Sequence, residues 1–152
     1  MSVFTELVGN IKKRKNVLLL TGYLCDEMEL GGRKLSDFAA QIALKLDLPV
    51  AATGSSAVPL KEKGVRATRK ALAEMVNLTR FPYWGDPITA QRPEMMVFIG
   101  YPARMLKSVL PAVKGVETVV LGNMSMKDAT FSLPDASLRE YQKNLESLIG
   151  SL

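Results

Sequence analysis

The chain carries Val17-Leu18-Leu19-Leu20-Thr21-Gly22 near its beginning, a short apolar run that ends at glycine. Three later runs have the same form and end at glycine or at a small polar loop: Pro49-Val50-Ala51-Ala52-Thr53-Gly54-Ser55-Ser56, Met96-Val97-Phe98-Ile99-Gly100 and Thr118-Val119-Val120-Leu121-Gly122-Asn123. Runs this short, and apolar throughout, are typical of strands buried on both faces of a parallel sheet. They predict an α/β fold with a mainly parallel sheet.

Amphipathic helices are predicted between the strands, because apolar residues recur there at helical spacing. We expect helices over about residues 3–13, 33–46 and 66–77, a fourth from about 103 that breaks near Leu110, and a final one after the capping box of Ser137 and Glu140. The final helix should bury Leu138, Tyr141, Leu145, Leu148 and Ile149. Residues 22–32 and the stretch after Ser56 are expected to be loops, and 129–133 a short edge strand. Alternating strands and helices predict one domain over residues 1–152.

Small residues at the strand ends predict where a ligand would bind, because ligands of open parallel sheets lie in the crevice beyond the carboxyl ends of the strands. The candidate site residues are Gly22, Thr53, Gly54, Ser55, Gly100 and Asn123. Hydroxyls and backbone N–H groups over residues 53–56 suit phosphate oxygens, and they equally suit a plain strand-to-helix turn. Tyr101 is a candidate for stacking on a ligand ring. The glycine and lysine spacings match neither a Walker loop nor a dinucleotide fingerprint.

Missing residue types restrict the chemistry. The chain has no histidine and a single cysteine, Cys25. It therefore lacks the commonest general base, and one thiol cannot hold an iron–sulfur cluster or a structural zinc. We expect no catalytic residues and no metal of its own, so any metal chemistry belongs to a partner. A buried, unreactive thiol is the favoured interpretation of Cys25.

Charge and hydropathy are ordinary for a globular protein. The formal net charge is +5, and much of it comes from Lys12, Lys13, Arg14 and Lys15. The favoured interpretation of this cluster is a solvated helix end, with contact to phosphate or an acidic partner as the alternative. We expect no nucleic-acid partner, no membrane partner and a cytoplasmic location, because no apolar run spans a bilayer and no secretory signal is visible.

Residues 79–94 follow neither a helical nor a strand period. They include Phe81, Tyr83 and Trp84, followed by Gly85-Asp86-Pro87. Aromatic residues in an irregular segment often anchor an interface or fill a small satellite core. We predict an ordered loop with one of these two roles, in preference to direct ligand contact.

These features, taken in order, resemble one protein family. The stretch Leu48-Pro49-Val50-Ala51-Ala52-Thr53-Gly54-Ser55-Ser56 resembles the most recognisable segment of the epsilon subunit of the archaeal acetyl-CoA decarbonylase/synthase complex. Further similarity lies in residues 14–22, 84–86, 96–100, 109–114 and 123–132, and so covers nearly the whole chain. The sequence departs from the family at Gly22-Tyr23, where a first turn richer in glycine is expected, and at Pro111.

The resemblance implies a Rossmann-like fold, similar to the middle domain of thiamine-diphosphate enzymes and to electron-transfer flavoproteins. It implies a subunit that stabilises the large nickel–iron–sulfur subunit of a carbon monoxide dehydrogenase, two copies of each, in acetyl-CoA cleavage and synthesis in methanogenic archaea. It also implies that the subunit aids electron transfer to FAD, which would lie on the candidate site residues. The alternative is a free-standing FAD- or nucleotide-binding electron-transfer protein, and self-association of the isolated chain stays open.

Overall fold

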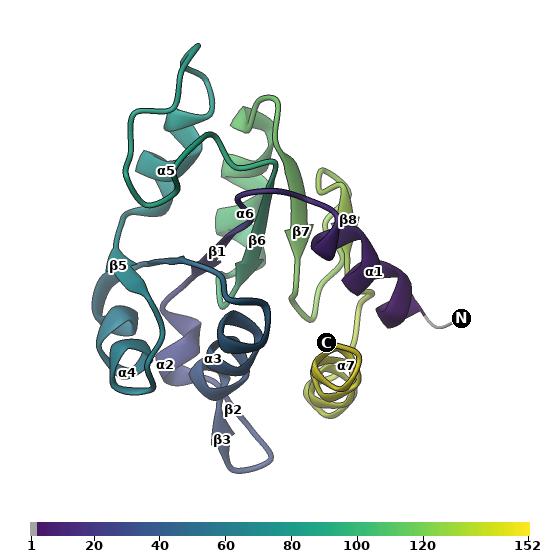
Figure 1. Cartoon of the computed structure of the whole chain (residues 1–152). Helices are drawn as coiled ribbons and strands as arrows, with labels where there is room; N and C mark the ends of the chain where they lie inside the picture. The colour runs from purple at the N-terminus through teal and green to yellow at the C-terminus, as the bar shows by residue number, and fades with distance from the viewer. Residues whose placement is uncertain (1–2) are drawn as a thin grey trace.

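A computed structural model of the chain describes residues 3–152 (Figure 1). Its centre is a six-stranded parallel sheet with the order β5-β4-β1-β6-β7-β8. The strands are β1 (Leu18–Thr21), β4 (Val50–Ala52), β5 (Ala67–Arg69), β6 (Met95–Ile99), β7 (Glu117–Val120) and β8 (Phe131–Ser132). The prediction of a mainly parallel sheet is confirmed, and so is the short strand at its edge.

Helices cover both faces of the sheet (Figure 1). They are α1 (Val3–Lys12), α2 (Leu24–Glu27), α3 (Leu35–Leu46), α4 (Ala57–Glu62), α5 (Leu72–Leu78), α6 (Ala103–Val109) and α7 (Leu138–Gly150), with short 3-10 turns η1 (Gly54–Ser56) and η2 (Leu110–Ala112). Side chains of each strand alternate between the faces, so Leu19 packs with α1, α3 and α7 while Leu18 and Leu20 pack with α5 and α6. Because both cores are apolar, the strands show no polar alternation in sequence.

Three predictions about local structure are wrong. Residues 22–32 are not a plain loop, since they form α2 and then a hairpin of β2 (Glu29–Leu30) with β3 (Arg33–Lys34). The stretch after Ser56 contains α4, whose Pro59 falls in the first turn, where a missing N–H costs nothing. The predicted helix over 66–77 begins as β5 and becomes helical only at α5. The missed helices have at most two turns and the missed strands at most three residues, which is too short to produce a period in the sequence.

The end of the chain follows the prediction with one exception. Ser137 and Glu140 form the capping box, with the Glu140 N–H donating to the Ser137 hydroxyl at 3.2 Å. The break at Pro111 is present as η2 after α6. Leu138, which was predicted to be buried, is half exposed because it occupies the first helical position, ahead of the stripe that packs on the sheet.

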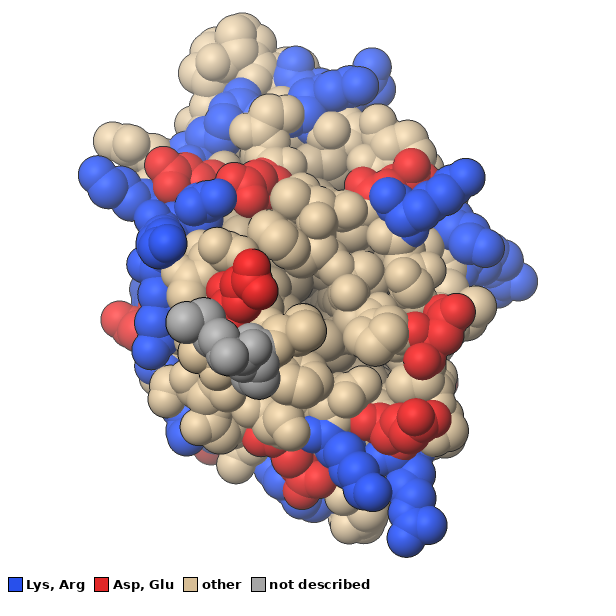
Figure 2. Space-filling view, turned by 90° about the vertical axis from the view of Figure 1, so that its right-hand side faces the viewer, with Lys and Arg blue, Asp and Glu red and all other residues tan. Residues whose placement is uncertain are grey.

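The side of the molecule that carries α1, β8 and α7 has an uncharged, hollowed centre with charged side chains around it (Figure 2). A pocket of about 180 Å³ lies there, lined by α1 residues and by Phe131, Ser132 and Leu133. No helix within residues 3–152 combines the length and the apolar character needed to cross a membrane.

The capping box predicts the effect of one substitution. Ser137→Ala should lower the free energy of unfolding by about 1 kcal/mol, since it leaves N–H groups of the first turn of α7 without their acceptor. Urea denaturation followed by circular dichroism measures this. Ser147→Ala, on the exposed face of the same helix, is the matched control and should not destabilise the protein. Equal effects of the two changes would contradict a capping role.

Candidate functional site

The carboxyl ends of the strands meet at one edge of the sheet, as the sequence predicted. Gly22 follows β1, Thr53 follows β4, Gly100 follows β6, and Asn123 lies shortly after β7. The chain passes from β1 outward to β4 and β5, then returns to β6 on the other side of β1. The strand order therefore reverses between β1 and β6, which is where ligands of doubly wound sheets bind.

The backbones at this reversal are in direct contact. The Gly22 N–H donates to the Ile99 carbonyl at 2.9 Å, and a Cβ added to Gly22 would lie 2.3 Å from the Gly100 carbonyl oxygen. Gly100 has φ +86°, and a Cβ there would lie 2.5 Å from the Cys25 sulfur. Both positions require glycine, because no side chain fits between the two strand ends.

Tyr101 closes the space beside this contact. Its side chain is 7% exposed, and its ring meets Phe98 edge-on with 6.2 Å between centroids. Its hydroxyl lies 3.1 Å from the Thr53 hydroxyl, a hydrogen bond that joins the ends of β6 and β4. Burial raises the pKa of Tyr101 well above its usual value. Tyr101 thus packs within the protein, where the sequence suggested it for stacking on a ligand.

The hydroxyl groups after β4 already have partners within the chain. The Ser55 hydroxyl donates to Asp26 Oδ2 at 3.1 Å, and the Ser56 hydroxyl donates to the Thr53 carbonyl at 2.7 Å. Gly54, with φ +62°, begins the turn η1. A phosphate here would have to replace these bonds, so the geometry matches the strand-to-helix turn that the sequence left open as the alternative.

Asn123 follows β7, three strands along the sheet from β4 and Thr53, and lines a pocket together with Tyr101. With Gly122, Met124 and Met126 it lines a pocket of about 20 Å³. Sites for drug-sized ligands are roughly 300–1,000 Å³. The pocket that Asn123 shares with Tyr101 is therefore too small, as the side chains lie here, for a flavin ring.

Cys25 is fully buried beneath this edge. Its thiol donates to the Ile99 carbonyl at 3.6 Å. Burial, with a smaller contribution from the charge of Asp26, raises the pKa of the Cys25 thiol from 9.0 to about 12. The thiol therefore stays protonated and inert at neutral pH, as the sequence interpretation favoured.

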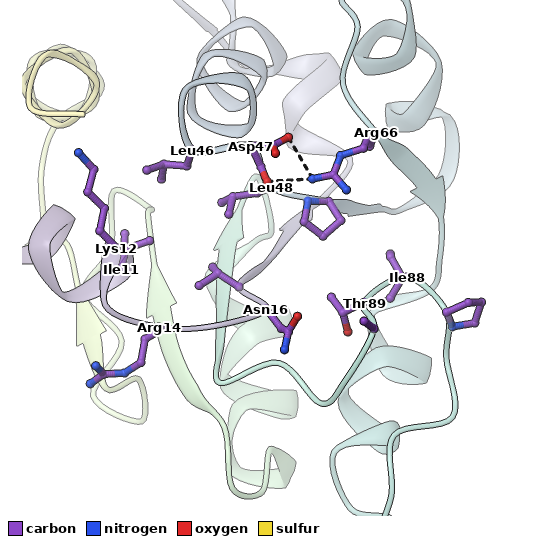
Figure 3. Close-up of a pocket in the computed structure, with 14 residues that line it drawn as sticks. Ile11, Lys12, Arg14, Asn16, Leu46, Asp47, Leu48, Arg66, Ile88 and Thr89 are labelled. Carbon is purple, nitrogen blue, oxygen red and sulfur yellow. Dashed lines mark hydrogen bonds and ion pairs between the residues drawn. The ribbon is translucent and has the colours of Figure 1, made fainter.

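A pocket of about 620 Å³ lies at the opposite, amino edge of the sheet (Figure 3). Its walls come from four separate segments, residues 11–17, 46–49, Arg66 and 87–90. Arg66 donates to the Asp47 carbonyl at 2.8 Å and to Asp47 Oδ1 at 3.1 Å, while Asn16 lies opposite Ile88 and Thr89 (Figure 3). This pocket could not be predicted from the sequence, because no local pattern marks a cavity whose walls come from distant segments.

The charged groups of this pocket are largely paired. Arg14 turns away from Asn16 (Figure 3) and binds Glu117, with its Nη2 atom 2.7 Å from Oε1. Lys12 makes no ion pair with any of residues 3–152. Nor do Cys, Asp and Glu side chains gather in threes at a metal-binding spacing in this described part of the chain.

The parallel sheet, the helices on both faces and the reversal of strand order define a Rossmann-like α/β protein. Similarity to known proteins narrows this class to one family. The chain is 30% identical to acetyl-CoA decarbonylase/synthase complex subunit epsilon 1 of Methanosarcina barkeri over 146 residues, which are 93% of this chain and 82% of the relative. It is 28% identical to acetyl-CoA decarbonylase/synthase complex subunit epsilon 2 of Methanosarcina mazei, again over 93% of this chain and 82% of the relative. No family model matches the chain. The protein belongs to the epsilon-subunit family of the acetyl-CoA decarbonylase/synthase complex, as the resemblance predicted.

The buried thiol predicts slow chemical modification. Cys25 in the folded protein should resist iodoacetamide at mildly alkaline pH, and it should react fully in concentrated urea, measured by mass spectrometry. Since folding raises this pKa, the thiol stabilises the fold fully below pH 9.0, and this contribution is lost as the pH rises toward 12. Rapid alkylation of the folded protein would contradict the burial.

Proposed function

We propose that this protein is an accessory subunit of an acetyl-CoA decarbonylase/synthase complex. The observation that carries the proposal is the 30% identity to a subunit of that name across 93% of the chain. The match covers 93% of this chain and 82% of the relative, so it is not limited to a shared motif.

Within the complex, the proposed partner is the large nickel–iron–sulfur subunit of the carbon monoxide dehydrogenase component, with two copies of each. The role of this chain is to stabilise that subunit. A chain with no histidine and one buried thiol supports this division of labour, because it leaves the clusters and the chemistry to the partner.

Reconstitution tests the proposal. The large subunit should bind this protein when the two are produced together, and light scattering after gel filtration should give the mass of two copies of each. The large subunit should also gain thermal stability, because a ligand that binds only the folded state stabilises it. Two folded proteins that elute separately, with no change in thermal stability, would contradict the proposal.

FAD binding at the carboxyl edge, for electron transfer, is a second proposal with a clear structural condition. The candidate residues surround the reversal of strand order, which favours this location. For the ring to lie between Gly100 and Asn123, Tyr101 must first leave its buried place, because the pocket that Tyr101 lines with Asn123 measures only about 20 Å³. The same condition applies to a free-standing electron carrier.

Tyr101→Ala tests the flavin site. Removing the ring should strengthen FAD binding about tenfold over the wild type, because the wild type pays the cost of displacing a packed side chain before the ligand enters. Quenching of flavin fluorescence measures the affinity, and circular dichroism checks that the variant is folded. Tyr141→Ala, which opens a cavity in the other core, is the control. Binding that is unchanged or weaker in Tyr101→Ala would contradict this location.

A further inference from the structure

The irregular segment between α5 and β6 displays aromatic side chains to solvent. Phe81 is 57% exposed and Tyr83 is 76% exposed. The segment forms the upper end of the molecule in Figure 1, at the amino edge of the sheet. In the space-filling view that end is an uncharged lobe with Lys and Arg side chains beside it (Figure 2). Large aromatic groups in such a place are the residue types that dominate protein interfaces.

The segment is fixed to the body of the protein. Lys70 Nζ donates to Asp86 Oδ2 at 2.8 Å, and the side chains are only 21% and 10% exposed. Burial alone would raise the pKa of Asp86, but hydrogen bonds from Lys70 and from the Ile88 N–H outweigh it and hold the pKa below its usual value. Arg92 donates to the carbonyls of Thr79 and Phe81. The aromatic groups are therefore held in place before any partner arrives, which lowers the entropy lost on binding.

Trp84 anchors the loop, but its indole N–H makes no hydrogen bond within the described residues. Its side chain packs against the core beneath α5 and α6. Its indole Nε1 is buried and has no hydrogen-bond acceptor among residues 3–152. Buried donors of this kind are rare in a finished structure. Trp84 therefore holds the loop against the core while Phe81 and Tyr83 stay exposed.

Exposed positive charge also lies at this amino edge of the sheet. The cations are Lys12, Lys13, Lys15, Arg80 and Lys114, which all lie in segments leading into strands. The nearby carboxylates are engaged within the chain, since Glu94 accepts from the Lys15 N–H and Glu117 binds Arg14. The pocket of about 620 Å³ opens on this edge, and residues 87–90 of the same segment form one of its walls.

We propose that this amino edge, centred on Phe81 and Tyr83, is the surface by which the protein docks on another subunit of its complex. The partner surface offers an apolar hollow for the two rings and a rim of Asp and Glu for the surrounding cations. A second copy of this chain does not fit, because it would bring the same cationic edge against itself. The inference rests on the proposed accessory function and specifies the surface that performs it.

A double substitution tests the surface. Phe81→Ser with Tyr83→Ser should weaken binding to the large subunit at least about tenfold, measured by titration calorimetry with the wild type in parallel. Val58→Ser with Leu138→Ser removes exposed apolar groups elsewhere, 59% and 50% exposed, and should leave the affinity unchanged. Arg80→Glu is a third variant, at an exposed site with no packing role, and it should weaken binding most at low salt.

The outcomes separate this inference from the proposed function. Binding by the wild type with equal affinity in all the variants would overturn the docking surface and leave the accessory function intact. Failure of the wild type to bind would overturn the accessory function itself. Self-association of the wild type that the double substitution abolishes would overturn the assignment of the partner in favour of a second copy. Should the double variant fail to fold, the salt-dependent loss in Arg80→Glu decides.

Discussion

Where β1 and β6 end, the Gly22 N–H donates to the Ile99 carbonyl. A Cβ on Gly22 would meet the Gly100 carbonyl, and one on Gly100 would meet the Cys25 sulfur, so neither position accepts a side chain. This contact joins the two halves of the sheet at the point where the strand order reverses. It fixes the place of Tyr101, whose hydroxyl reaches Thr53 and ties in β4 as well. The cores on both faces depend on this register, because β1 contributes Leu19 to one core and Leu18 and Leu20 to the other.

The same contact determines what the carboxyl edge offers. In a sheet of this order the reversal point is usually open to a ligand. Here glycine backbones, a tyrosine ring and a buried thiol lie at the reversal, and the pocket between Tyr101 and Asn123 is about 20 Å³. This packing closes the space beside Tyr101 to a ligand as large as a flavin.

The amino edge of the sheet, in contrast, is open and exposes apolar side chains. Its loops leave a pocket of about 620 Å³, and the segment 79–94 carries exposed aromatic groups on a frame held by Lys70, Asp86 and Arg92. We propose this edge as the docking surface of a subunit that belongs to the epsilon family. The two edges thus differ in packing, with a closed carboxyl edge beside Tyr101 and exposed aromatic side chains at the amino edge.

Local sequence alone determined the strands, the long helices, the capping box at Ser137 and the shared edge of the strand ends, because burial on both faces and helical periodicity leave direct marks in the order of residues. The short elements α2, α4 and β5 could not be predicted in this way, since so few residues show no period. Only the tertiary structure decided that Gly22 and Gly100 meet, that Tyr101 turns inward and that distant segments enclose the amino-edge pocket. Those features depend on distances between residues far apart in the chain, and such distances exist only once the sheet has formed.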